Sequence, residues 1–255
     1  MTRSALALAG HAAAATTALG MIAVPLARPG GELRRHLSGA VVTGLAATTT
    51  LATARRWSWA RTAAGAAVVA VGTAAVERIG TSTGWPFGRY RYTGRLRPEV
   101  AGVPVVVPLA WWAMAVPARE AAHSALGALG WRSTPVRRVA LGAVALTAWD
   151  LFLDPQMTAE GYWRWARGGS YRGIPLSNYA GWLLTSAAVM AMLEALLPAA
   201  EPDRALVGEY AAMGVMETVG FAAFFGDRLV AAVGGLAMVP LAAAAVAGVV
   251  RSGDG

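Results

Sequence analysis

The sequence contains no cysteine and no lysine, and only 14% of its residues are charged. Without cysteine, disulfides, thiolate metal sites and cysteine nucleophiles are all excluded. A chain of 255 residues that is 56% hydrophobic has too little polar surface to cover a soluble globule, which indicates an integral membrane protein. Because lysine is absent, the net charge of +8 comes from arginine, whose guanidinium group pairs well with phosphate head groups and carboxylates.

Several catalytic and nucleotide-binding motifs are also missing. There is no GxSxG elbow, no Walker loop and no GxGxxG after a strand, so serine hydrolysis and nucleotide-dependent chemistry lack sequence support. His11, His36 and His123 share no metal-ligand spacing and are interpreted as packing or interfacial residues. The arginines are spread among short loops and form no single stripe, which argues against nucleic-acid binding. The sequence therefore predicts no metal and no cofactor.

Long apolar runs occupy most of the chain, and most approach the roughly 20 residues that a helix needs to cross a bilayer. They predict an all-α, polytopic bundle of seven or eight transmembrane helices, forming one integral membrane domain over residues 1–255, in the cell membrane. The first run is too long for the core of a cleaved signal sequence, so we expect a retained helix. The second and third are short, so one of them is a candidate re-entrant segment. The predicted spans are 4–27, 38–54, 62–76, 103–118, 136–153, 180–199, 206–225 and 229–250.

Two loops, 77–102 and 154–179, hold most of the unusual residues. Two predicted crossings separate them, so we expect both on the same face of the membrane. With eight spans, 12 arginines lie on that side and 10 on the other, so the positive-inside rule predicts no orientation. The first loop contains TGWPFGRYRYTGRL at residues 83–96, a stretch rich in aromatic rings and arginine between two apolar runs.

Three acidic residues are expected beside these loops. Asp150 and Asp154 are spaced i, i+4, so both carboxyl groups lie on one helical face, and Pro155 is expected to end that helix. Glu77 is expected to end the third predicted helix on the same side. Acids at membrane depth usually face the bundle interior and form pairs or do chemistry. The alternatives are an interfacial cap or an ion pair with a nearby arginine, namely Arg78, Arg89 or Arg91.

The remaining acids attract weaker expectations. Glu120, Glu194 and Glu209 are expected toward the opposite face, and Glu160 and Asp227 in solvent. Glu217 falls near the middle of the seventh predicted span, where a glutamate is either protonated or paired.

The motifs around the two loops resemble those of a known family. Glu77 precedes TGWPFGRYRYTGRL, which is followed by GVPVVVPLAWWAMA at 102–115, WDLFLDPQM at 149–157 and GIPLSNYAGW at 173–182. Together these stretches resemble the carotenoid biosynthesis membrane family that includes the carotenoid hydratases of the bacterioruberin and myxol pathways. The resemblance covers about residues 75–195 and supports the pathway more firmly than the reaction. It implies addition of water to the terminal trisubstituted C=C of an acyclic carotenoid, giving a tertiary alcohol.

This reaction needs a proton donor, a means of stabilising a tertiary cation and a positioned water molecule. Asp150, Asp154 and Glu77 are the candidate acid and base, because a poorly solvated carboxylic acid can supply the proton and an ionised one can deprotonate the water. Asn178 is expected to hold the water or, preferably, to cap the sixth helix. Aromatic faces can stabilise the cation, although aromatic belts also occur at membrane interfaces. The candidate substrate-binding aromatics are Trp85, Phe87, Tyr90, Tyr92, Trp111, Trp112 and Trp163.

In this interpretation the aromatic loop is a lid that admits the end of a rod-like lipid. The expected partners are an acyclic carotenoid, lycopene-like or an elongated C50 form, together with membrane lipid and other enzymes of the pathway. Three alternatives stay open: a carotenoid end-group cyclase, an intramembrane prenyltransferase suggested by the paired aspartates, and a carotenoid-binding subunit without catalysis.

Overall fold

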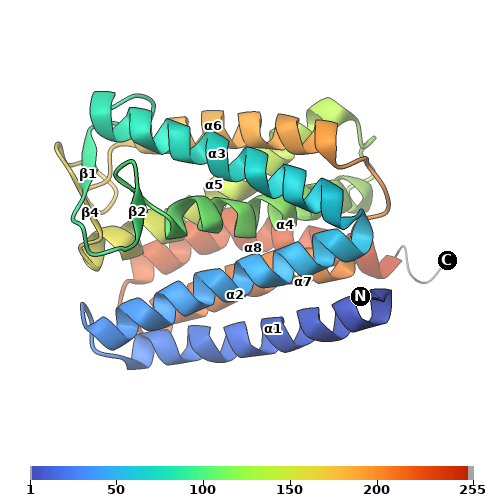
Figure 1. The fold of residues 1–255 in the computed structure, drawn as a ribbon, viewed down its shortest axis with the longest axis horizontal. Helices are drawn as coiled ribbons and strands as arrows, with labels where there is room; N and C mark the ends of the chain where they lie inside the picture. The colour runs from blue at the N-terminus through green and yellow to red at the C-terminus, as the bar shows by residue number, and fades with distance from the viewer. Residues whose placement is uncertain (1, 252–255) are drawn as a thin grey trace.

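The computed structural model describes residues 2–251, and over this range the chain is a bundle of eight long α-helices (Figure 1). This confirms the all-α prediction. The helices are α1 (Arg3–Ala23), α2 (Glu32–Arg56), α3 (Trp59–Thr83), α4 (Val106–Ala128), α5 (Pro135–Ala159), α6 (Leu176–Leu196), α7 (Arg204–Ala223) and α8 (Arg228–Arg251). The short elements are the 3-10 helix η1 (Val24–Leu26) and the strands β1 (Tyr90–Tyr92), β2 (Glu99–Val100), β3 (Val103–Pro104) and β4 (Trp163–Trp165).

Five helical segments of the described chain are long and apolar enough to cross a membrane, which confirms the membrane bundle. They are α1 with η1, α2, α3, α6 and α8. Helices α4, α5 and α7 have similar lengths, between 20 and 25 residues, but charged side chains such as Arg119 and Asp150 interrupt their apolar sequence. Helix α4 lies inside the bundle, where other segments cover Arg119 and Glu120.

The second and third helices are longer than the sequence predicted. Each has 25 residues and runs along the bundle, so neither is re-entrant. Hydropathy missed the first turn of α2 because Glu32, Arg34 and Arg35 are charged. It missed the last turns of α3 because they are rich in hydroxyl groups, and α3 ends only at Gly84, whose φ of +88° suits glycine.

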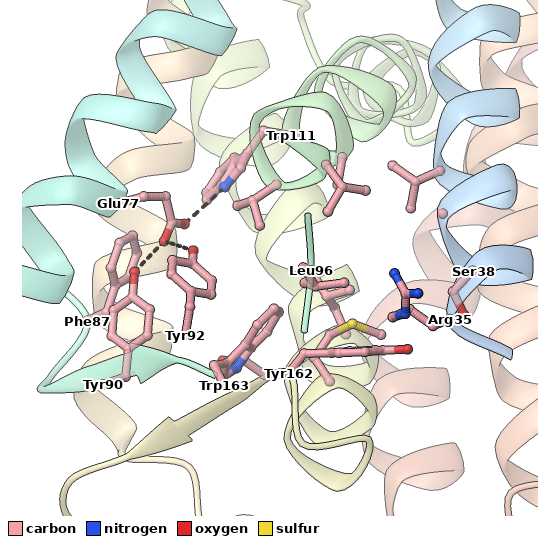
Figure 2. A pocket seen from close by; sticks show the side chains of 18 of the residues that line it. Arg35, Ser38, Glu77, Phe87, Tyr90, Tyr92, Leu96, Trp111, Tyr162 and Trp163 are labelled. Atoms are coloured by element: carbon pink, nitrogen blue, oxygen red, sulfur yellow. Dashed lines mark hydrogen bonds between the residues drawn. The ribbon is translucent and has the colours of Figure 1, made fainter. Parts of the chain in front are cut away.

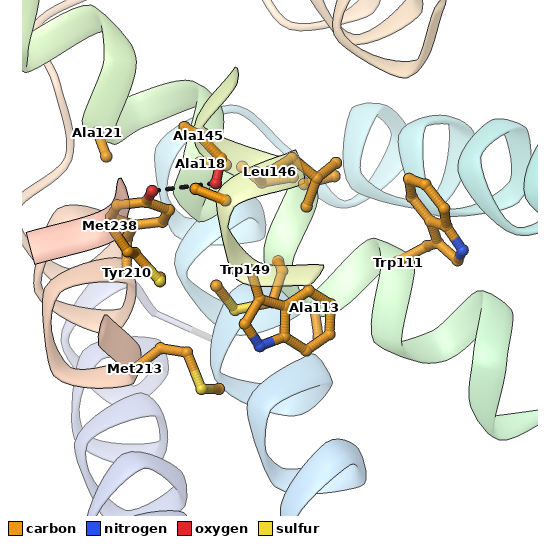
Figure 3. Packing of buried hydrophobic residues seen from close by; sticks show 14 of the residues in the cluster. Trp111, Ala113, Ala118, Ala121, Ala145, Leu146, Trp149, Tyr210, Met213 and Met238 are labelled. Carbon is orange, nitrogen blue, oxygen red and sulfur yellow. Dashed lines mark hydrogen bonds between the residues drawn. The ribbon is translucent and has the colours of Figure 1, made fainter. Parts of the chain in front are cut away.

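Helix α4 forms the centre of the bundle. It packs against α2, α3, α5, α7 and α8, and every residue from Trp111 to Ala122 is buried. A helix buried on all sides can be apolar on all sides, so its sequence shows no single core face. Figure 3 shows the packing around it, where alanines alternate with larger side chains such as Trp111, Leu146 and Met238. Small residues let the helices approach closely: a Cβ on Gly234 of α8 would lie 2.6 Å from the Phe152 ring.

Helices α4 and α5 each contain a proline that does not end the helix. Pro155 lies inside α5, which continues to Ala159, so the prediction that it ends the helix was wrong. Proline leaves the carbonyl four residues earlier without its N–H partner. In α5 that carbonyl belongs to Leu151, and the Tyr171 hydroxyl donates to it at 2.9 Å. In α4, Pro117 leaves the Ala113 carbonyl free, and the Thr49 hydroxyl lies 2.8 Å from its oxygen.

A two-stranded antiparallel ribbon joins the two unusual loops. Tyr90 pairs with Trp165 and Tyr92 with Trp163, so β1 and β4 lie together at one end of the bundle. This confirms that the two loops share one face. A second pair, β2 and β3, forms a hairpin leading into α4. The start of α1 and the end of α8 lie at the other end of the bundle.

Candidate functional site

A cavity of about 210 Å³ lies at the end of the bundle that carries the ribbon, and we call it the aromatic pocket. Its walls come from α2, α3, α4, α5, α6 and both loops (Figure 2). The structure brings eight of the predicted site residues to this pocket. They are Glu77, Phe87, Tyr90, Tyr92, Trp111, Asp154, Trp163 and Asn178.

Glu77 is held by aromatic donors. The Tyr92 hydroxyl donates to its carboxylate at 2.7 Å, the Tyr90 hydroxyl also donates to it, and Trp111 Nε1 lies 3.4 Å from its other oxygen. The side chain is buried, and α3 continues past it to Thr83, so Glu77 does not end the helix as predicted. No ion pair with a neighbouring arginine is found for it within residues 2–251. The aromatic loop and α4 thus supply the donors that hold this carboxylate.

The two tyrosines remain protonated donors. Burial raises the pKa of Tyr90 and Tyr92 well above the usual range, and the nearby Glu77 carboxylate raises the pKa of both further. Tyr90 also packs edge-on against Phe87 and Tyr92, with ring centroids 6.2 and 5.7 Å apart. The ribbon therefore fixes the rings and their hydroxyl groups together.

Asp150 and Asp154 meet at Asn178. The Asn178 amide nitrogen donates to Asp150 Oδ2 at 2.8 Å and also donates to Asp154. Asp150 is fully buried behind the pocket, whereas Asp154 lines it. The capping role preferred for Asn178 was wrong, because Pro175 occupies the N-cap of α6 and Asn178 lies in its first turn, facing the aspartates. The i, i+4 spacing did place both carboxyl groups on one face of α5.

Two of the predicted aromatic residues lie outside the pocket. Trp85 is 61% exposed at the start of the loop. Trp112 is buried, but it faces α2, where its Nε1 donates to Thr50 Oγ1 at 3.0 Å. Adjacent tryptophans on a helix point about 100° apart, so only Trp111 reaches the pocket.

Other pocket residues were not predicted. The Trp111 ring stacks on Trp182, with centroids 4.0 Å apart, and Trp149 meets Trp182 edge-on. Trp165 also lines the pocket. The sequence held a signal for two of the missed residues. Trp182 follows Asn178 by four residues and so lies on the same helical face, and Trp165 follows Trp163 by two residues and so lies on the same side of β4. No pattern indicated that Arg35 and His36, at the start of α2, also line the pocket.

Glu160 is buried, so the prediction that it lies in solvent was wrong. It is 8% exposed and forms a 2.7 Å ion pair with Arg34 of α2. Its other oxygen accepts from the Gly30 N–H at 2.9 Å. Asp227 is less buried and pairs with Arg172. The Glu160 contacts fasten the second loop to the start of α2, and sequence spacing gives no sign of a contact between segments so far apart.

Three other acids lie away from the pocket. Glu120 and Glu194 join Arg119 and Arg138 in a buried network at the opposite end of the bundle, as expected for that face. Glu217 lines a smaller cavity next to the aromatic pocket. No group of three or more His, Asp or Glu side chains with metal-binding geometry occurs in the part of the chain that the structure describes.

Comparison with known proteins decides the family. A family model described as "Carotenoid biosynthesis protein" matches residues 37–251. The chain belongs to this family. It is also 34% identical, over 120 residues, to a bisanhydrobacterioruberin hydratase of Haloarcula japonica. That alignment covers 47% of this chain and 40% of the relative, so the chain matches less than half of that protein's length. No solved structure matches.

Membership confirms the resemblance seen around the two loops and extends it to residues 37–251. Together with the apolar helices, it identifies a membrane protein of carotenoid biosynthesis.

Proposed function

We propose that the protein is a carotenoid hydratase that adds water to the terminal C=C of an acyclic carotenoid and gives a tertiary alcohol. The observation that carries the proposal is the presence of two carboxyl groups, Glu77 and Asp154, from different helices in one apolar, aromatic-lined pocket. The hydratase name of the relative supports the same reaction class. We place this activity in the cell membrane, where the substrate dissolves in lipid.

Asp154 is the proposed proton donor. Asp150 and Asp154 share the amide donor of Asn178, and two carboxyl groups held this closely are most stable when they share one proton. Asp154 faces the pocket and can pass this proton to the less substituted carbon of the C=C. Asp150, enclosed behind it, and Asn178, which donates to both aspartates, are positioning residues.

Glu77 is the proposed base. Proton transfer leaves a tertiary cation, which a carboxylate opposite Asp154 stabilises by charge. A water molecule then attacks the cation, and Glu77 accepts the proton that the new oxygen releases. In sum, one alkene and one water give one alcohol. The proton then returns from Glu77 to the aspartate pair before the next turnover.

The aromatic rings stabilise the same cation. Each ring face contributes roughly 0.5–2 kcal/mol to a nearby cation where water is excluded. Trp111, Tyr92 and Trp163 line the pocket beside the two acids, and the β1–β4 ribbon covers that end of the bundle. The ribbon thus takes the place of the single-loop lid expected from the sequence.

The test is expression in cells that make an acyclic carotenoid, followed by mass analysis of extracted pigments. Hydration adds the mass of one water for each end that reacts. A pigment of unchanged mass with altered absorption or retention would instead indicate the cyclase. Unchanged pigment, with protein present in the membrane, would favour the carotenoid-binding subunit.

A further inference from the structure

The outer face of the β1–β4 ribbon carries arginine where its inner face carries aromatic rings. Arg91 and Arg164 are directly paired across the two strands, and both are exposed because side chains alternate along a strand. The pairing continues beyond the strands: the Ala166 N–H donates to the Arg89 carbonyl at 2.8 Å, and the Arg89 side chain is exposed as well. We call Arg89, Arg91 and Arg164 the arginine face.

No carboxyl group neutralises the arginine face. The ion pairs found within residues 2–251 all involve other arginines, such as Arg34, which pairs with Glu160. Residues directly opposite on paired strands have Cβ atoms about 5 Å apart, and like charges in that arrangement destabilise the pair. An anion bound between Arg91 and Arg164 therefore removes a repulsion that no side chain compensates in the described part of the chain.

The arginine face lies at the level of the lipid head groups. Strand β1 follows α3, and β4 follows α5, at the same end of the bundle (Figure 1). Each of these helices has 25 residues, or about 37 Å at 1.5 Å per residue, which exceeds the roughly 30 Å of the hydrocarbon core. The ribbon beyond their ends therefore meets the head-group region. Phosphate groups are abundant there, and guanidinium groups bind phosphate through two parallel hydrogen bonds.

The net charge of the face selects among phospholipids. A zwitterionic head group brings a cation together with its phosphate, which places a further positive charge beside the arginines. A phosphatidylglycerol head group has a net negative charge and adds no cation. Each arginine near an anionic membrane surface strengthens binding by about fivefold. Charge complementarity therefore favours an anionic phospholipid.

The inner face of the same two strands holds Glu77. Tyr90 and Tyr92 point from β1 toward its carboxylate and donate to it (Figure 2). Trp163 of β4 packs edge-on against Tyr92, with ring centroids 6.0 Å apart. Repulsion on the outer face and hydrogen bonding on the inner face thus act on one two-stranded element. A lipid that removes the repulsion also stabilises the strand that carries the donors.

We propose that the arginine face binds the head groups of anionic phospholipids and that this binding orders the β1–β4 ribbon over the aromatic pocket. The lipid binding goes beyond the proposed function and does not depend on it. Its effect on turnover rests on the proposed function, because Glu77 is the base in that reaction.

The first experiment measures lipid binding at the arginine face. Because the chain has no cysteine, Ala166→Cys supplies a single thiol, at an exposed position of the ribbon, for a fluorophore. In phosphatidylcholine vesicles, phosphatidylglycerol bearing a quencher should quench the fluorophore at a lower mole fraction than phosphatidylcholine bearing the same quencher. In Arg91→Gln/Arg164→Gln that preference should fall by about tenfold or more. The control, Arg132→Gln/Arg204→Gln, removes two exposed charges at the other end of the bundle and should keep the preference.

The second experiment supplies the counter-charge within the chain. Arg91→Glu places a carboxylate opposite Arg164, so the ribbon should no longer need an anion. A nitroxide on the Ala166→Cys thiol should be mobile in phosphatidylcholine vesicles and become less mobile when phosphatidylglycerol is added. In Arg91→Glu it should be equally immobile in both membranes, and hydration should lose its dependence on the anionic lipid. Arg28→Glu, the same charge change at an exposed position at this end of the bundle, should keep the wild-type response.

The outcomes separate this inference from the proposed function. Equal quenching by the two lipids in wild type, or an unchanged preference in Arg91→Gln/Arg164→Gln, overturns the lipid binding. A label that responds to phosphatidylglycerol in Arg91→Glu as it does in wild type overturns the ordering role. Immobilisation of the label by inorganic phosphate in phosphatidylcholine vesicles would assign the face to a soluble anion and overturn the inference. Pigment that is never hydrated, with quenching and label mobility as expected, overturns the proposed function and leaves the inference intact.

Discussion

At the scale of single residues, the three carboxyl groups of the site differ in their surroundings. Asp154 faces the pocket, Asp150 is enclosed behind it, and Glu77 is held by aromatic donors. Substitutions at these three positions can therefore separate the contributions of charge, hydrogen bonding and acid-base chemistry to activity.

Replacing Asp154 with asparagine keeps its size but removes its exchangeable proton. We expect turnover per folded molecule to fall at least ~100-fold in Asp154→Asn, as is typical for loss of a general acid. Glu77→Gln should fall similarly, because an amide cannot accept the proton of the attacking water. The measurement is hydrated pigment per unit of folded membrane protein.

The control is Asp227→Asn, the same change in an ion pair outside the pocket lining, which should keep full turnover. If the acids serve only as structural partners, Asp150→Asn, Asp154→Asn and Glu77→Gln will lower protein yield while activity per folded molecule stays intact. That pattern would remove the catalytic assignment.

Sequence reasoning at this scale succeeded where local spacing determines geometry. The i, i+4 spacing of the aspartates put both carboxyl groups on one face of α5. It failed for Glu160 and Asn178, whose partners lie on other elements. Nothing in their own neighbourhoods shows a contact with Arg34 or with Asp150.

At the scale of elements, the prolines of α4 and α5 are compensated by hydroxyl groups from other segments. Tyr171→Phe removes the donor to the Leu151 carbonyl and should cost about 1–3 kcal/mol in stability, the cost of an unsatisfied buried acceptor. In a Pro155→Ala background the helix regains its own N–H donor, so the same change should cost much less. Thermal unfolding of the four proteins in detergent measures this difference.

Equal costs of Tyr171→Phe in both backgrounds would show that the hydroxyl group does not compensate for the proline. Activity serves as the internal control, since Tyr171 does not line the aromatic pocket.

The ion pair between Arg34 and Glu160 connects α2 with the second loop. Breaking a buried pair leaves one charge without a partner, so Glu160→Gln should lower stability by about 3–5 kcal/mol. The comparison is Glu32→Gln, which breaks the 3.3 Å pair with Arg35, where the Glu32 side chain is 83% exposed. That change should cost at most about 1 kcal/mol. Similar melting temperatures for the two variants would contradict a fastening role.

Helix ends were the weakest part of the sequence prediction. Hydropathy located the apolar centre of each helix but stopped where charged or hydroxyl side chains began, as in α2 and α3. Those residues remain in the helix because groups on neighbouring segments pair with their polar side chains. Arg34, for example, pairs with Glu160. A hydropathy window contains no information on such partners.

At the scale of the whole molecule, the proposed reaction moves only a proton and a water molecule. Membranes carrying the purified protein should therefore stay active after exhaustive chelation and without added nucleotide. The measurement is pigment hydration before and after chelator treatment, with a magnesium-dependent enzyme in the same membranes as a positive control. Loss of activity that magnesium restores would favour the prenyltransferase.

The number of helices was predictable from the sequence, but their arrangement was not. Each apolar run is long enough to be seen by itself. Which helix lies in the centre depends on packing, and lipid tails are as apolar as the protein core, so the core face of a helix such as α6 or α8 leaves no hydropathy signal.

The charges of the central helices also bear on how the chain enters the bilayer during synthesis. Helices α4 and α5 leave the ribosome before α6, α7 and α8, which later cover them. Until then, side chains such as Arg119 and Asp150 lack their final neighbours, and exposing them to lipid is costly. We therefore expect stable integration of α4 and α5 to depend on the later helices. A nascent chain released after α3 holds only helices apolar enough to stay in the membrane, whereas one released after α5 holds two that are not.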